Sequence, residues 1–143
     1  MSIRLLVLAP MLLFPLHAAN LMWEKEPPKR IKVRLTAYWV GQDRWTSKYQ
    51  SSTGSKLIAG YSCAVDPYVI PYGSTVTLVK TGRQFRAVDT GTAVVNRKSE
   101  WWKPRKKRLP VVDLFFKSEK EAEREMAKIG KYAEVDISKK EKK

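Results

Sequence analysis

Short β-type runs separated by glycine and proline constrain the fold of this chain more than any other feature. Residues 31–40 alternate between apolar and polar side chains, as expected for a strand with one buried face. Further β-type runs cover residues 57–65, 74–80, 84–88 and 132–137, with turn-forming residues between them. Because the runs are short and closely spaced, the pattern favours a small β-barrel or sandwich over a βαβ arrangement.

One segment near the C-terminus has the features of a helix. Ser118 is followed three residues later by Glu121, which is a capping box, so we expect a short helix over residues 119–128. Its apolar side chains would share one face that packs against the β-structure. They are Ala122, Met126 and Ile129.

The first nineteen residues are typical of a secretory signal peptide. Arg4 precedes an apolar run over residues 5–16, and Ala18 or Ala19 supplies the small residue before a cleavage point. The run is short for a bilayer-spanning helix and contains two prolines; an uncleaved N-terminal anchor is the alternative. We therefore expect an exported protein of the periplasm, the cell wall or the extracellular space.

The rest of the chain has the length of a single domain. We divide it after the signal segment (residues 1–19) into a linker at 20–30, a β-domain at 31–138 and a basic tail at 139–143. A core of this size can be stable without disulfides. Cys63 is the only cysteine, and its apolar surroundings predict a buried core position rather than a nucleophile.

The formal net charge of +14 indicates an acidic partner without identifying it. Five of the six residues from Lys103 to Arg108 are basic, and two tryptophans precede them. Such a segment can bind single-stranded nucleic acid, but in an exported protein an acidic wall polymer is the favoured partner. The alternative is a solvated loop whose tryptophans cover one end of the β-domain.

The available catalytic groups are limited because His17, the single histidine, lies in the signal segment. The mature chain would therefore lack His-based triads and most kinds of zinc site, and we expect neither a metal nor a cofactor. Carboxylates are then the remaining acid–base groups.

Three aspartates, Asp66, Asp89 and Asp113, each stand where an apolar run meets a turn. A carboxylate at a strand end can point into a cleft while the strand stays buried; the alternative for each is a turn-forming role. Carboxylates that share a partly desolvated cleft cannot all stay ionised cheaply. One of them should have a raised pKa and keep its proton near neutrality.

With the residues around them, these aspartates resemble the 3D (three-aspartate) domain of MltA lytic transglycosylases and of small secreted wall-remodelling proteins, an RlpA-like double-psi barrel. The resemblance covers about residues 33–137 and implies a mainly β, six-stranded double-psi β-barrel with one short helix near the C-terminus. The chain departs from the family in an insert at residues 96–110. The matching segments are Thr36-Ala37-Tyr38, Ser52-Thr53-Gly54, Ala64-Val65-Asp66-Pro67, Ile70-Pro71-Tyr72-Gly73, Val88-Asp89-Thr90-Gly91 and Val112-Asp113-Leu114-Phe115-Phe116.

What the resemblance implies about function is cleavage of peptidoglycan glycan strands without water. Asp113 would protonate the oxygen between MurNAc and GlcNAc and then accept the C6 hydroxyl proton as the 1,6-anhydro ring closes. Asp66 and Asp89 would order the site and raise the pKa of Asp113. The expected substrate contacts are Thr36, Tyr38, Trp45, Thr53, Gly54 and Gly91.

Several alternatives remain open on the sequence alone. A non-catalytic, expansin-like barrel would bind wall glycan through the same cleft, and a secreted basic protein could bind nucleic acid. Asp89-Thr90-Gly91 also matches the motif of aspartic proteases, which need it twice. In the loop at residues 41–56, Trp45 and Tyr49 would either stack on sugar rings or pin the loop to the domain.

Overall fold

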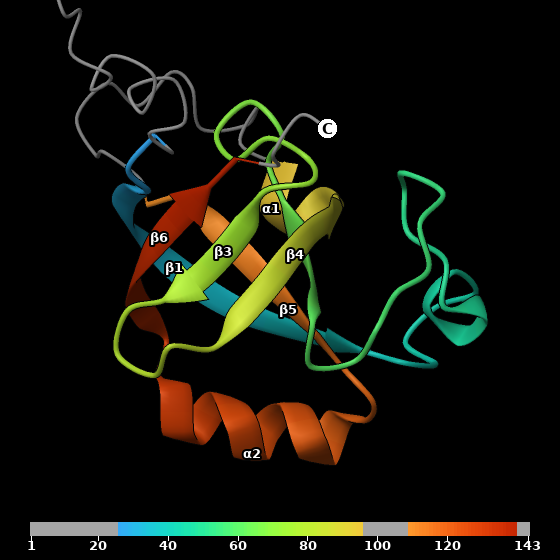
Figure 1. The fold of residues 1–143 in the computed structure, drawn as a ribbon. Coiled ribbons are helices and arrows are strands. Elements are labelled where there is room, and N and C mark those ends of the chain that lie inside the picture. The colour runs from blue at the N-terminus through green and yellow to red at the C-terminus, as the bar shows by residue number, and fades with distance from the viewer. Residues whose placement is uncertain (1–25, 96–108, 140–143) are drawn as a thin grey trace, which may run out of the picture.

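The structure is a computed structural model that describes residues 26–95 and 109–139 (Figure 1). Four predicted features therefore lie wholly or partly outside the described residues. They are the signal segment at 1–19, the linker up to residue 25, the insert at 96–108 with its basic run, and the tail at 140–143.

Six strands close into a barrel in the order β1-β5-β2-β4-β3-β6. The pairs β1/β5 and β2/β4 are parallel, and the other four neighbouring pairs are antiparallel. The strands are β1 Lys29–Trp39, β2 Ser62–Val65, β3 Thr75–Leu78, β4 Gln84–Asp89, β5 Val111–Phe116 and β6 Tyr132–Ser138.

The strand order contains an internal two-fold relationship. Exchanging β1, β2 and β3 with β4, β5 and β6 reproduces the same ring of neighbours with the same directions. The two parallel pairs are exchanged with each other by this operation. The predicted mainly β, closed six-stranded barrel is confirmed, and the symmetry is the one expected of a double-psi topology.

Strand β5 is buried on both faces and separates two apolar clusters. Its residues Val112, Leu114 and Phe116 belong to the larger core, together with the fully buried Cys63. Because side chains alternate along a strand, Val111 and Phe115 point the other way. They form a second cluster with Tyr38, Leu57, Ala64 and Val94. The residue between them, Asp113, therefore belongs to the side of the second cluster.

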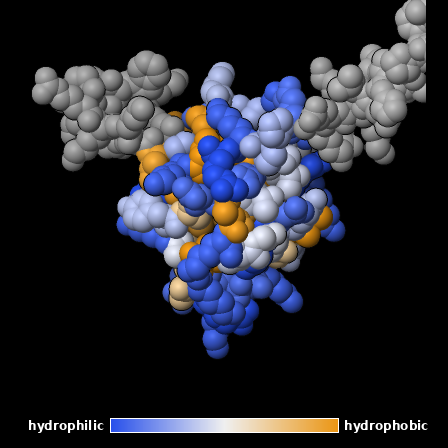
Figure 2. Space-filling model, turned by 60° about the vertical axis from the view of Figure 1, so that its left-hand side comes forward, coloured by the Kyte–Doolittle hydropathy of each residue, from blue (hydrophilic) through white to orange (hydrophobic). Residues whose placement is uncertain are grey.

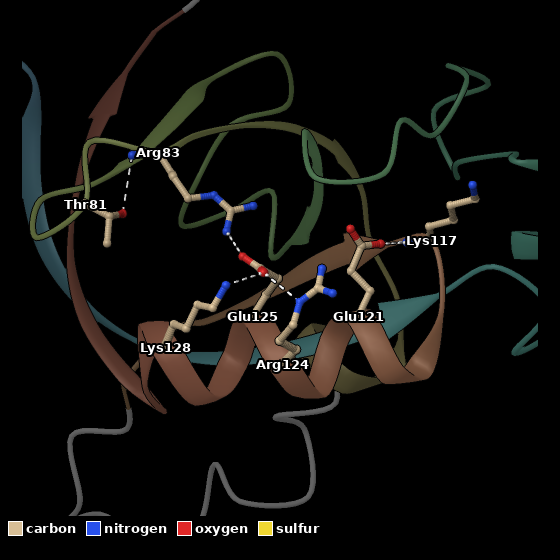
Figure 3. A network of polar contacts seen from close by, with 7 residues as sticks. All are labelled: Thr81, Arg83, Lys117, Glu121, Arg124, Glu125 and Lys128. Atoms are coloured by element: carbon tan, nitrogen blue, oxygen red, sulfur yellow. Dashed lines mark hydrogen bonds and ion pairs between the residues drawn. The ribbon is translucent and has the colours of Figure 1, made fainter.

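The predicted C-terminal helix is confirmed as α2, Glu119–Ile129, which lies across the bottom of the barrel in Figure 1. Its N-cap is Ser118, whose hydroxyl accepts a hydrogen bond from the Glu121 N–H at 3.2 Å. The face with Ala122 and Ile129 is buried against the barrel. On the adjacent side, Glu125 binds Arg83 of the β3–β4 hairpin at 2.7 Å (Figure 3). The hairpin and the helix are thus joined by an ion pair.

The predicted starts of the first two strands are wrong. The second strand begins at Ser62 and not at residue 57, because Gly60, with a φ of 74°, and a hydrogen bond from Ser62 N–H to the Ile58 carbonyl form a turn before it. The first strand begins at Lys29, inside the predicted linker. There Arg30 makes two hydrogen bonds to Asp136 of β6, of 2.7 and 2.8 Å.

Two short helices were not predicted, the 3-10 helix Thr46–Lys48 (η2) and the four-residue helix α1, Thr92–Val95.

The side of the barrel with β6 and β1 is largely hydrophilic, with apolar patches between the charged side chains (Figure 2). Among the described residues, no helix is both long and apolar enough to cross a membrane.

Candidate active site

Asp113 and Asp89 lie on either side of Ala64, which belongs to the second apolar cluster. Asp113 is in register with Thr36 of β1 and with Ala64 of β2, and Ala64 is also in register with Asp89 of β4. Two strand spacings place the aspartate backbones about 10 Å apart. Ala64, the residue between them, carries only a methyl group and is itself buried.

Asp113 is a buried carboxyl group with 8% of its surface exposed. The Thr36 hydroxyl donates a hydrogen bond to its Oδ1 at 2.6 Å. Burial raises the pKa of Asp113 to about 6, the Thr36 hydrogen bond opposes this rise, and the charge of Asp89 adds to it. A carboxyl group in this environment retains its proton into the weakly acidic range.

Asp89 is equally buried but accepts three hydrogen bonds. The Tyr38 hydroxyl donates to Oδ2 at 3.0 Å, and the backbone N–H groups of Ser52 and Thr90 donate to Oδ1 at 2.8 and 2.9 Å. Burial, followed by the neighbouring Asp89 charge, raises the pKa of the Tyr38 hydroxyl, which therefore remains a donor. Three donors favour the charged form of a carboxylate.

The loop between β1 and β2 is fastened to the end of β4 beside Asp89. The Thr90 N–H donates to the Ser52 hydroxyl at 3.0 Å, and the Thr53 hydroxyl donates to the Val88 carbonyl at 2.7 Å. These contacts come from a tight turn at residues 51–55, in which Gly54 adopts a φ of 80° that other residues rarely adopt. The turn thus places a backbone donor on Asp89.

A cavity of about 520 Å³ lies between this loop and the strand end. Trp45, half of whose surface is exposed, lies on it, and the Arg44 guanidinium stacks 4.5 Å from the indole ring. The Thr90 hydroxyl is buried without a hydrogen-bond partner in the described part of the chain. The residues that line the cavity are Asp43, Trp45, Thr46, Gln50, Ser51, Ser52, Gly54, Asp89 and Thr90.

The structure gives different positions to the two aromatic residues of the loop, whose roles the sequence left open. The ring of Tyr49 packs edge-on against Phe115 at 6.2 Å, so Tyr49 pins the loop to the barrel. Trp45 instead lies on the wall of the cavity. A stacking role therefore remains a prediction for Trp45 alone.

Asp66, the remaining aspartate, bonds within its own turn and not to the residues around Asp89 and Asp113. Asp66 directly follows β2, is half-buried, and accepts the Tyr68 N–H at 3.1 Å, which is the turn-forming alternative. Its charge is not among the causes of the raised pKa of Asp113. The expectation that all three aspartates stand at strand ends is wrong for Asp113, which is the third residue of β5.

The predicted substrate contacts fall into three groups. The hydroxyl groups of Thr36, Tyr38 and Thr53 are bonded to protein atoms, namely Asp113, Asp89 and the Val88 carbonyl. Gly54 and Trp45 line the cavity. Gly91 is exposed, and its carbonyl accepts the N–H groups of Val94 and Val95 as α1 begins.

Sequence reasoning missed the backbone donors of Ser52 and Thr90 and the cavity residues Asp43 and Gln50. The two donors lie in segments that match the resemblance. Any residue type other than proline can supply a backbone N–H, however, so the sequence does not reveal such a contact. Asp43 had a detectable signal, because aspartate side chains in turns commonly accept backbone N–H groups a few residues further on. Its Oδ1 accepts the N–H groups of Trp45 and Thr46 at 2.8 and 2.7 Å.

Comparisons with known proteins do not establish a family for this chain. No family model matches it, and no curated protein matches it. Its fold has some similarity to a lytic transglycosylase of Burkholderia pseudomallei, LtgG, with a TM-score of 0.36 and 22% sequence identity. The match covers 61% of this chain and 24% of that protein, so the chain spans about a quarter of its length.

Within the described residues, no group of three or more histidine, cysteine, aspartate or glutamate side chains is placed to hold a metal ion.

Proposed function

We propose that this chain is an exported lytic transglycosylase that cleaves peptidoglycan glycan strands, with Asp113 as the acid and base. The observation that carries this proposal is the unequal pair of carboxyl groups. Asp113 is buried, accepts one hydrogen bond and has a pKa of about 6, whereas Asp89 accepts three hydrogen bonds. One site therefore offers both a proton donor and a fixed negative charge, which glycosidic bond cleavage requires.

In this mechanism, Asp113 first gives its proton to the oxygen that links MurNAc to GlcNAc. The bond between that oxygen and C1 of MurNAc breaks, and the Asp89 carboxylate counters the positive charge that develops on the sugar ring. Asp113, now ionised, takes the proton of the MurNAc C6 hydroxyl while the C6 oxygen bonds to C1. Asp113 ends the reaction protonated, as it began, and no water molecule is consumed.

The cavity beside Asp89 would hold part of the glycan. A volume of about 520 Å³ is within the range of small-ligand sites. The half-exposed ring of Trp45 offers a flat surface for the C–H face of a pyranose, and the buried Thr90 hydroxyl offers a hydrogen-bonding group that has no protein partner among the described residues. The basic run Lys103 to Arg108 would add contacts to an acidic wall polymer.

The experiment is digestion of purified peptidoglycan with the mature chain and separation of the products by mass. Products lighter by one water than hydrolysis products carry 1,6-anhydro ends and support the proposal. Hydrated reducing ends would indicate a muramidase-type hydrolase instead. If nothing is released while the protein sediments with the wall, the protein is a glycan-binding, expansin-like module and the proposal is wrong.

Replacement of Asp113 provides the matched pair of variants for this experiment. Asp113→Asn should abolish product release, because the amide cannot supply the proton. Asp136→Asn makes the same chemical change on the barrel surface, where Asp136 pairs with Arg30, and should leave release unchanged. Full activity of the Asp113 variant would assign the acid role to another carboxyl group.

A further inference from the structure

We infer that Tyr38 and the turn at residues 51–55 are positioning groups, which hold Asp89 as the anion and thereby leave the proton of the pair on Asp113. The use of that proton in glycan cleavage rests on the proposed function. The placement of the proton does not, since it follows from the hydrogen bonds of the folded chain.

Strand β1 carries the side-chain donors of both aspartates. Thr36 and Tyr38 are two residues apart and therefore lie on the same face of the strand. The Thr36 hydroxyl bonds to Asp113 at 2.6 Å, and the Tyr38 hydroxyl bonds to Asp89 at 3.0 Å. One strand thus supplies one side-chain donor to each carboxyl group, and on this count alone the two aspartates are equal.

The backbone donors break this equality. The N–H groups of Ser52 and Thr90 both point at Oδ1 of Asp89. Among the described residues, Asp113 has no donor besides Thr36. When two interacting carboxyl groups share one proton, the proton stays on the group whose anion is less stabilised. That group is Asp113.

The other titratable groups around the pair do not reverse this preference. Cys63 of β2 is fully buried, and burial raises its pKa, so it stays an uncharged thiol. The Tyr38 hydroxyl is likewise uncharged, and helix α1 contains no charged residue. Asp43 lies across the cavity and carries negative charge, with its own donors lowering its pKa. In the described part of the chain, no basic group contributes to the raised pKa of Asp113.

The turn at residues 51–55 also belongs to the wall of the cavity, through Ser51, Ser52 and Gly54. Ser52, whose backbone N–H stabilises the Asp89 carboxylate, therefore also lines the space that a ligand in the cavity would occupy. Tyr38, in contrast, is not among the residues that line this cavity, and its hydroxyl group bonds to Asp89. A role of Tyr38 in catalysis would have to act through Asp89.

The test follows the side-chain carboxyl carbons of Asp89 and Asp113 by NMR as pH is raised, because these resonances move when the proton leaves. In the wild-type chain at weakly acidic pH, we expect Asp113 to report the protonated form and Asp89 the ionised form. Tyr38→Phe removes only the hydroxyl group. It should weaken the preference for Asp113 about tenfold, so that Asp89 takes part of the proton. In the active protein kcat should fall while KM stays unchanged.

Tyr49→Phe is the matched control, because its ring also packs on Phe115 but its hydroxyl does not contact either aspartate. It should leave both resonances and kcat as they are. Thr53→Val removes the hydroxyl that fastens the turn, and with it the Ser52 N–H, to the end of β4, and it tests the turn if Tyr38→Phe does not fold. Its effect should be in the same direction and smaller.

Unchanged proton placement in both Tyr38→Phe and Thr53→Val would overturn the inference. If the resonances behave as expected but no glycan is cleaved, the proposed function fails and the proton placement stands. If glycan is cleaved and Asp89 carries the proton in the wild-type chain, the inference fails and the proposed function stands, with its acid role moved to Asp89.

Discussion

The hydroxyl oxygen of Thr36 lies 2.6 Å from Oδ1 of Asp113, across two neighbouring parallel strands that are in register at these residues. This contact limits the effect of burial. The apolar surroundings raise the pKa of the Asp113 carboxyl group, and the Thr36 hydroxyl stabilises its anion and so lowers the pKa. The balance of the two, with the Asp89 charge added, gives a pKa of about 6. A much higher or a much lower pKa would be less suitable for a group that must both give and take a proton.

Replacement of Thr36 by valine should therefore move the alkaline limb of the activity profile upward. Thr36→Val keeps the shape of the side chain but removes the donor, so the pKa of Asp113 should rise by roughly one unit. The measurement is kcat as a function of pH. Thr77→Val, on β3, makes the same change away from both aspartates and should not move the limb. A downward shift for Thr36→Val would contradict the role given to this hydrogen bond.

Asp89→Asn should move the same limb in the opposite direction. The variant removes the negative charge that helps to raise the pKa of Asp113, while the amide oxygen can still accept the Ser52 N–H. Burial, the larger cause, is unchanged, so the pKa should fall only part of the way from about 6 toward its ordinary value. The activity that remains should reach its alkaline limit at lower pH than in the wild-type chain. An unchanged limit would show that Asp89 does not act on Asp113 through its charge.

The barrel could be predicted from the sequence because its strands are amphipathic and its turns use glycine and proline. Val33 and Leu35 alternate with polar residues, and this alternation survives as the buried and exposed faces of β1. Strand β2 could not be delimited in the same way. The residues before it are as apolar as the strand itself, and only the left-handed Gly60 and its turn decide where pairing starts.

The candidate site was predictable in its residue types and not in its geometry. The segment that contains Asp66 is the most specific part of the resemblance, yet Asp66 bonds to its own turn. Asp113 was expected where an apolar run meets a turn, and it lies inside β5. It is accommodated within β5 because Thr36 in the neighbouring strand supplies a donor. Such a cross-strand pair joins residues far apart in the chain, and no local pattern reveals it.

The ion pair between Arg83 and Glu125 provides a test of stability that is separate from the site (Figure 3). Arg83 also covers two buried rings, with its guanidinium 5.3 Å from Phe85 and 6.0 Å from Phe116. Arg83→Ala should lower the free energy of unfolding by about 1 kcal/mol, through lost packing as well as lost charge. Arg124→Ala removes a more exposed partner of Glu125 and should have a smaller effect. Urea unfolding measures both, and equal losses would mean that the contacts with the rings contribute nothing.

Asp113→Asn should stabilise the fold while it abolishes activity. The ordinary pKa of an aspartate side chain, taken for the unfolded chain, is 3.8, and the pKa of Asp113 in the folded chain is about 6. Between these two pH values the folded state therefore binds a proton that the unfolded state has lost. The stability due to this group is therefore fully present below about pH 4 and is lost as the pH rises to about 6. The loss amounts to about 3 kcal/mol. Asparagine carries no proton to lose, so the stability of the variant relative to the wild-type chain should increase over this range.

Asp136→Asn is the control of opposite sign for this prediction. The hydrogen bond and charge of Arg30 lower the pKa of Asp136, so its contribution to stability appears as the pH rises and is lost in acid. The Asp136 variant should thus become less stable than the wild-type chain as the pH rises, while the Asp113 variant becomes more stable. Thermal unfolding of all three proteins decides the matter, from acid below the ordinary pKa of 3.8, where the Asp136 variant should change, up through the weakly acidic range, where the Asp113 variant should change. If the Asp113 and Asp136 variants change in the same direction, Asp113 is ionised in the folded protein and cannot be the proton donor.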